Sequence, residues 1–143
     1  MFSKSCQYAI QAILFISLKG DKGPVSIKTI CEHQSVPSHF LAKILQQLVK
    51  QNFLISIKGP NGGFSINPNL VDFRLIDVVT LIDGTDIFNQ CGIGLKQCSD
   101  AHPCPVHSTF KQVKEHVKNI LTEKSLQELT NELRTGKTNL IEL

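Results

Sequence analysis

Residues 54–66 read Leu-Ile-Ser-Ile-Lys-Gly-Pro-Asn-Gly-Gly-Phe-Ser-Ile, and this stretch decides the fold. Two short runs of strand-forming residues, 54–57 and 64–66, flank a segment rich in glycine, proline and asparagine. These residue types favour tight turns, because glycine and asparagine tolerate positive φ angles and proline fixes its own φ. The stretch therefore predicts a β-hairpin with a glycine-rich tip.

The residues before the hairpin have the pattern of three helices. Residues 4–18 are apolar on nearly all sides, which is typical of a buried helix. Ser26 suits the cap of a short second helix, and Pro37 suits the first position of a third. The third helix has an apolar stripe of Leu41, Ile44, Leu45 and Leu48. Two short helices and a polar turn form a helix-turn-helix, and a hairpin directly after it predicts a winged helix.

The second half of the chain predicts two more helices around an irregular segment. Residues 75–82 form a short buried helix that ends at Gly84. A longer helix follows over 106–121, with apolar residues in steps of four and three at Val106, Phe110, Val113, Val117 and Ile120. This spacing fits the seam of two paired helices and equally the core face of a single domain.

The predicted fold class is mainly α with a small β-hairpin. We divide the chain into a winged helix-turn-helix DNA-binding domain at 1–84, a cysteine-bearing sensor loop at 85–105, and a dimerisation helix with a C-terminal tail at 106–143. The sensor loop is expected to be irregular, because it contains several glycines and prolines.

The sequence predicts a cytoplasmic protein. The chain has 143 residues, 41% of them apolar, and a formal net charge of +3, which permits nucleic-acid binding without arguing for it. No apolar run is long enough to span a membrane, and no signal-peptide cleavage site follows the first apolar stretch. Five cysteines are an odd number, which suits metal ligands or redox thiols better than a disulfide framework.

Two groups of residues are candidates for DNA contacts. The outward positions at the start of the third helix are Ser38, His39, Ala42, Lys43 and Gln46, which reach base edges or phosphates if this helix enters the major groove. The hairpin adds Lys58 at its base and Gly59, Pro60, Asn61 and Gly62 at its tip. An ordinary polar helix face and an ordinary hairpin loop remain the alternative interpretations.

Cys91, Cys98 and Cys104 lie within fourteen positions, and His107 follows three residues later. Thiolates are the usual ligands of iron–sulfur clusters, and histidine replaces a thiolate in some of them. His107 is the first candidate for a fourth ligand and His102 the second. Zinc is the competing metal, although the closely spaced Cys-x-x-Cys pairs of many zinc sites are absent. A metal-free thiol switch is a further alternative.

Several motifs together resemble the winged-helix regulators typified by IscR, NsrR and CymR, the Rrf-type family. They are Ser3-Lys4, Tyr8-Ala9, Phe40-Leu41, Ile44 to Leu48, Lys58 to Phe64, Leu75 to Val79 and Asp83-Gly84. The resemblance implies a dimeric bacterial regulator that binds roughly palindromic sites on double-stranded DNA. It also implies that residues 38–46 read the major groove, that the hairpin around Lys58 touches the minor groove, and that the 106–121 helix pairs with its copy.

Several members of that family sense iron–sulfur status, nitric oxide or redox state through a bound cluster, so the resemblance implies a 2Fe-2S or 4Fe-4S cofactor. This chain departs from the pattern in three ways. Lys58 stands where the family often has arginine, and the gap between Cys91 and Cys98 is one residue longer. The N-terminal neighbourhood also offers Cys6, Gln7 and Tyr8 where some relatives have a carboxylate ligand.

The sequence therefore predicts a DNA-binding transcription regulator, most simply a repressor, and not an enzyme. One alternative is a cluster-free winged-helix repressor that senses through thiols, zinc or a protein partner. A more remote one is a thiol enzyme that uses Cys104 with His107 or Cys98 with His102. Cys6 and Cys31 lie among apolar residues, which predicts that both belong to the core.

Overall fold

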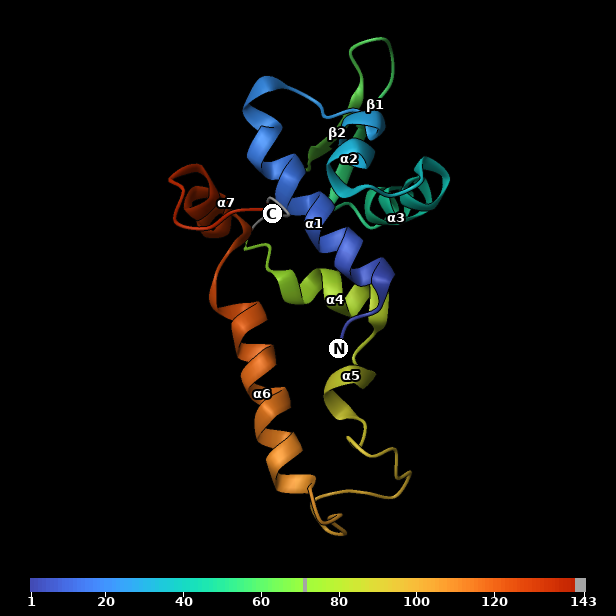
Figure 1. Ribbon diagram of the computed structural model, residues 1–143, viewed down its shortest axis with the longest axis vertical. Coiled ribbons are helices and arrows are strands. Elements are labelled where there is room, and N and C mark those ends of the chain that lie inside the picture. Colours follow the sequence, from blue (N-terminus) through green and yellow to red (C-terminus); the bar gives the residue numbers. More distant parts are fainter. Residues whose placement is uncertain (71, 141–143) are drawn as a thin grey trace.

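Helix α1 (Lys4–Lys19) is the central helix of the winged-helix body in the computed structural model, which describes residues 1–70 and 72–140. Ala9, Ile13 and Ile16 on this helix are fully buried, because neighbouring elements cover it on several sides. A single 3-10 turn, η1 (Gly20–Lys22), ends it. Helices α2 (Ile27–Gln34) and α3 (Ser38–Lys50) form the helix-turn-helix beside it (Figure 1).

The local signals at these helices match the structure closely. Ser26 caps α2, since its side chain accepts a hydrogen bond from the Thr29 amide at 3.2 Å. The turn between α2 and α3 passes through Ser35, which has a left-handed conformation with a φ of 54°. Pro37 is the N-cap of α3 and not its first helical residue, so the helix begins one position later than predicted.

Strands β1 (Leu54–Ile57) and β2 (Gly63–Ile66) form the wing, together with the tip at 58–62. They pair antiparallel, with Leu54 opposite Ile66 and Ile57 opposite Gly63. Val25 extends this sheet by a β-bridge to Phe64, with N–H···O distances of 2.9 and 2.8 Å. The wing is therefore fixed to the segment that precedes α2.

Three helices follow the wing and connect the body to the cysteine-bearing segment and back. Helix α4 (Leu75–Asp83) packs against α1, α5 (Asp86–Asn89) is one short turn, and α6 (His107–Glu123) is the longest helix (Figure 1). The prediction that 85–105 is wholly irregular is wrong at 86–89, because hydrogen bonds from Phe88 to Thr85 and from Gln90 to Asp86 close a turn there. Cys6, Val79 and Leu121 form the centre of a second apolar cluster that joins α1, α4 and α6.

Helix α7 (Leu126–Arg134) packs against α1 and was not predicted from the sequence. Ser125 caps it and Glu128 completes a capping box, with Ser125 N–H donating to the Glu128 carboxylate at 2.7 Å. Leu126 and Thr130 are buried, and the Thr130 hydroxyl lies 2.7 Å from that of Ser17. Helix α7 thus lies against the winged-helix body.

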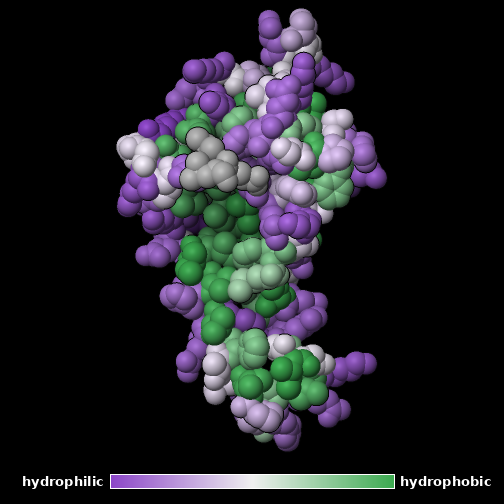
Figure 2. Space-filling model, in the orientation of Figure 1, coloured by the Kyte–Doolittle hydropathy of each residue, from purple (hydrophilic) through white to green (hydrophobic). Residues whose placement is uncertain are grey.

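The predicted fold class is confirmed: the protein is mainly helical with one small antiparallel hairpin. Hydrophobic residues gather on the narrow lower half of the molecule, in the region of α4, α5 and α6 (Figure 2). None of the helices in the described ranges has the length and apolar content that crossing a bilayer requires.

Candidate metal centre and DNA-binding surface

Helix α3 presents its polar residues outward, as the apolar stripe predicts. Ser38, His39, Lys43 and Gln46 are exposed, and Ala42 between them is half-buried. The opposite face holds the helix in place, because Leu41, Ile44, Leu45 and Leu48 are all buried in the core. The structure therefore brings the four predicted polar side chains together on the outer surface of one helix.

The wing tip projects beyond the body (Figure 1). Lys58, Gly59, Pro60 and Asn61 are exposed, and Gly62 is half-buried. The Gly62 amide donates to the Gly59 carbonyl at 3.0 Å and closes the turn. A Cβ atom at Gly62 would lie 2.1 Å from the carbonyl oxygen of Ile57, so this turn accepts only glycine there. Its close backbone packing leaves Lys58 beside a tip without bulky side chains.

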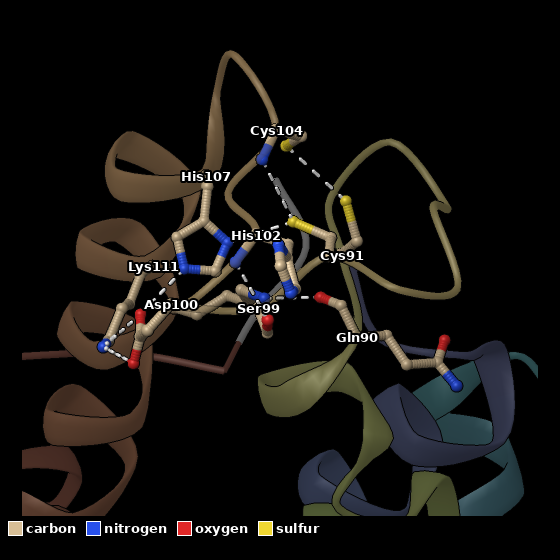
Figure 3. A network of polar contacts seen from close by, with 10 residues as sticks. Gln90, Cys91, Ser99, Asp100, His102, Cys104, His107 and Lys111 are labelled. Atoms are coloured by element: carbon tan, nitrogen blue, oxygen red, sulfur yellow. Dashed lines mark hydrogen bonds and ion pairs between the residues drawn. The ribbon is translucent and has the colours of Figure 1, made fainter.

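The three predicted cysteine ligands converge in the cysteine loop, residues 90–106 between α5 and α6. The sulfur atoms of Cys91, Cys98 and Cys104, called the cysteine triad below, all lie within 4.8 Å of one another. The sulfurs of Cys91 and Cys104 are 3.7 Å apart, and the Cys104 amide donates to the Cys98 sulfur at 3.4 Å (Figure 3). The described residues contain five free thiols, so these three are available as ligands.

His107, the first residue of α6, turns its ring toward the triad. Its Nδ1 atom lies 3.1 Å from the Cys98 sulfur, and its Nε2 atom lies 2.9 Å from a carboxylate oxygen of Asp100. A carboxylate only accepts hydrogen bonds, so Nε2 carries a proton, and Nδ1 is the ring nitrogen that faces the Cys98 sulfur. Histidine ligands of metals commonly have this arrangement, in which a carboxylate holds the other ring nitrogen.

Asp100 is a functional candidate that was not predicted from the sequence. It joins His107 to Lys111, whose ammonium group donates to both carboxylate oxygens at 2.8 and 2.9 Å (Figure 3). The neighbouring Lys111 and His107 hold the pKa of Asp100 below its usual value, so it remains ionised and keeps the imidazole oriented. The only signal in the sequence is that His107 and Lys111 lie four residues apart on one helix face.

The structure separates the two histidine candidates. His102 is exposed, and its backbone closes a turn with Ser99 through N–H···O distances of 3.1 and 3.2 Å. His107 lines a cleft of about 440 Å³ with Cys91 and Cys98, and His102 lines a second cleft of about 510 Å³ with Cys98 and Cys104, but it is the His107 ring that lies 3.1 Å from the Cys98 sulfur. The geometry therefore pairs Cys98 with His107, and neither of the two pairs considered for a thiol enzyme is the one that forms.

The cysteines differ in their chemical environments. Amide hydrogen bonds from Ile93 and Leu95 lower the pKa of Cys91 to about 7. The Cys104 amide lowers the pKa of Cys98, but desolvation and the neighbouring thiols outweigh it, so the net pKa of Cys98 is raised. Desolvation, together with Asp83, raises the pKa of Cys6 to about 12, in agreement with its predicted place in the core. Cys31 is half-buried and packs against the core.

These differences predict the order of thiol alkylation. At pH 7.5 most Cys91 in metal-free protein is thiolate, the reactive form, whereas only about one Cys6 in ten thousand or fewer is ionised. With iodoacetamide, peptide mass spectrometry is expected to show Cys91 modified at least about a hundred times faster than Cys6. Equal rates for the two thiols would contradict the described packing of α1.

The donor set fits a thiophilic metal. Ligands at the corners of a tetrahedron, about 2.3 Å from a single metal, lie about 3.8 Å apart. The Cys91–Cys104 separation of 3.7 Å agrees with that edge. Thiolate sulfur with an imidazole nitrogen is a donor set for zinc and for iron–sulfur clusters, and it is unsuited to calcium or magnesium. The site is therefore compatible with a metal ion or an iron–sulfur cluster.

Known proteins share this architecture. The Serratia proteamaculans (strain 568) HTH-type transcriptional regulator IscR is 26% identical over 125 residues, covering 87% of this chain and 76% of that protein. The solved structure of CymR (YrzC), the global cysteine regulator of B. subtilis, has a TM-score of 0.75 at 19% identity and covers 92% of this chain and 96% of that one. The solved structure of T. potens IscR has a TM-score of 0.74 at 21% identity and covers 98% of this chain and 93% of that one.

The family comparison decides the class of protein. Residues 2–132 match the model of the Rrf2 family, described as iron-dependent transcriptional regulator, and this match includes the helix-turn-helix, the wing, the cysteine triad and α6. The relatives are transcription regulators and not enzymes, which confirms the prediction from the sequence. With nearly its whole length matched, the chain belongs to the Rrf2 family of transcriptional regulators.

Proposed function

We propose that this protein is a dimeric, cytoplasmic repressor that binds DNA and responds to iron–sulfur, redox or nitrosative status through a group held by Cys91, Cys98, Cys104 and His107. The observation that carries the proposal is the convergence of three sulfurs and one imidazole nitrogen at the first turn of α6. No catalytic role is needed, because binding or loss of a metal group there changes the charge and shape of the cysteine loop.

The DNA contacts that we propose follow from the two exposed surfaces. Ser38, His39, Lys43 and Gln46 of α3 enter the major groove, and Lys58 of the wing meets the minor groove or a phosphate. Lysine carries a compact and strongly hydrated charge, whereas arginine is a planar fork suited to narrow minor grooves. We therefore expect Lys58 to contribute affinity more than sequence discrimination.

The dimer interface that we propose is the apolar face of α6. Phe110, Val113 and Ile120 are 39%, 48% and 57% exposed, so the body of the same chain leaves much of this seam uncovered. Of the two interpretations of the seam, the exposure favours pairing with a second copy. A dimer would present two α3 helices, which fits a roughly palindromic operator.

An iron–sulfur cluster is the group that we place first in the proposed site, in either 2Fe-2S or 4Fe-4S form. When bound, such a cluster supplies a centre that changes oxidation state. The cysteine triad binds it as thiolates, His107 is positioned to add the Nδ1 lone pair, and Asp100 holds the imidazole in that orientation. The second candidate is cluster-free sensing by zinc or by thiol oxidation, which the short Cys91–Cys104 distance favours.

The coupling between the metal site and DNA follows a two-state scheme. A group that binds one arrangement of the cysteine loop more tightly shifts the population toward that arrangement, and DNA affinity changes by the same coupling factor. The proposal therefore requires that metal-loaded and metal-free protein bind a given duplex with different affinities.

A salt titration tests the DNA-binding surface. A duplex is first selected by the protein from a random library, and its dissociation constant is measured between about 50 and 200 mM salt. Lys58→Gln is expected to weaken binding and to lower the slope of log K against log salt by about one per removed phosphate contact. Lys137→Gln is the matched control, because Lys137 lies beyond α7 and pairs with Glu132 at 3.0 Å. An unchanged slope for the Lys58 variant would remove the wing from the proposed interface.

A further inference from the structure

Helix α6 joins two regions of the molecule that the proposed function must connect. Its first residue, His107, lies at the cysteine triad, and its last turn lies at the winged-helix body (Figure 1). Its 17 residues span about 25 Å. Because a helix is stiff along its axis, movement of the cysteine loop reaches the body through the contacts that hold the C-terminal end of α6.

Arg74 makes the principal polar contact at that end. Its guanidinium group donates to the Thr122 carbonyl at 3.1 Å and to the Glu123 carbonyl at 3.0 Å. These carbonyls belong to the last turn of α6 and have no amide partner within the helix. The negative end of the helix dipole adds to the attraction for the cation. Arg74 therefore fixes the position of the last turn, and not merely its distance from the body.

The backbone beside Arg74 continues the connection. The Leu126 amide donates to the Phe73 carbonyl at 2.8 Å, and Ser125 forms a β-bridge with Arg74. The Phe73 ring is buried, and its centroid lies 4.9 Å from that of Phe53. Phe53 separates α3 from β1, and its amide donates to the Leu48 carbonyl in α3 at 2.9 Å. A continuous set of contacts thus runs from α6 through residues 73–74 to α3 and the wing.

We propose that Arg74 is the positioning residue that transmits the state of the metal site to the DNA-binding surface. It touches neither the cysteine triad nor the outward face of α3, so its effect passes through α6 and Phe73. The inference rests on the proposed function, because it requires that loading the site changes DNA affinity. It assigns that coupling to the C-terminal end of α6, opposite the end that carries the ligands.

The test compares dissociation constants for a selected duplex with metal-free protein and with protein reconstituted anaerobically with ferrous iron and sulfide. The quantity of interest is the ratio of the two constants, which for coupled sites is typically about 5 to 150. In Arg74→Gln this ratio is expected to fall to about one or two, with iron and sulfide content unchanged. Arg74→Lys keeps the charge but loses the planar fork, so its ratio is expected to lie between the two.

Arg134→Gln is the matched control. Arg134 pairs with Asp21 at 2.9 Å and donates to the Ser17 carbonyl of α1 at 3.4 Å, which is the same contact chemistry away from α6. Its ratio is expected to equal that of the unsubstituted protein. Thermal melts identify any variant that fails to fold. If Arg74→Gln fails to fold, the ratio of dissociation constants measured with Arg74→Lys decides whether Arg74 carries the coupling.

The two failures are distinguishable. If the unsubstituted protein shows a ratio of one, both the proposed sensing function and the role of Arg74 are overturned. If its ratio differs from one and folded Arg74 variants preserve it, only the role of Arg74 is overturned. If the ratio of dissociation constants also falls to about one in the Arg134 control, the role of Arg74 is equally overturned. Any weakened helix junction would then have the same effect.

Discussion

Cys98→Ala is expected to lose iron and sulfide almost completely when it is purified without oxygen, while its fold is retained. The Cys98 sulfur lies between the His107 ring at 3.1 Å and the Cys104 amide at 3.4 Å, so its removal takes one donor from the set and releases the imidazole. Structural four-ligand metal sites bind with about 10–16 kcal/mol, so one ligand contributes about 3 kcal/mol, or two orders of magnitude in affinity.

The measurement is iron and sulfide content together with the visible spectrum of the anaerobic protein. Cys31→Ala is the matched control, since Cys31 is a half-buried cysteine on α2 and is expected to leave the metal content unchanged. A colourless, iron-free parent protein from cells with intact cluster assembly would reject the cluster and leave zinc or thiol sensing. A Cys98 variant with full iron content would instead remove Cys98 from the ligand set.

The winged helix could be predicted from the sequence because its signals are local. The apolar stripe of α3 and the glycine-rich wing tip each specify their own conformation within a few residues. The first strand was predicted at its observed bounds, Leu54–Ile57, and the predicted cap at Ser26 is confirmed. These elements needed no knowledge of distant parts of the chain.

Helix α7 was missed although a local signal was present. Ser125 and Glu128 have the spacing of a capping box, which commonly marks the start of a helix. Its buried residues are few, and its apolar contacts are with α1, more than a hundred residues earlier in the chain. The apolar periodicity of α7 is therefore weak, because packing against α1 stabilises this helix more than its own sequence pattern does.

The ligand candidates could be identified by residue type, but their arrangement could not. A loop with several glycines and prolines permits many paths, so the sequence ranks His107 before His102 but does not place either ring. The structure turns the ring of His107 toward the triad because α6 begins at that residue and Asp100 holds its far nitrogen. Arg74 gave no signal at all, since its partners lie 48 and 49 residues away in sequence.

Gly62→Ala is expected to weaken duplex binding by about two orders of magnitude and to leave the helical content unchanged. A Cβ atom at this position would lie 2.1 Å from the Ile57 carbonyl oxygen and 2.9 Å from the Lys58 carbonyl carbon, and both are backbone atoms that side-chain movement cannot relieve. The turn must open, which breaks the Gly62–Gly59 hydrogen bond and displaces Lys58. A tenfold loss of affinity per wing corresponds to about 1.4 kcal/mol. Because both wings of a dimer bind one duplex, the free-energy loss doubles, which is about a hundredfold in affinity.

The measurement is the dissociation constant for the selected duplex, with circular dichroism as the check on folding. Gly20→Ala is the matched control, because Gly20 has a helical φ of −59° and a Cβ there would meet no atom within 4 Å. Its affinity is expected to equal that of the parent protein. If the Gly62 variant binds as tightly as the parent, the wing tip lies away from the duplex, and the DNA contacts belong to α3 alone.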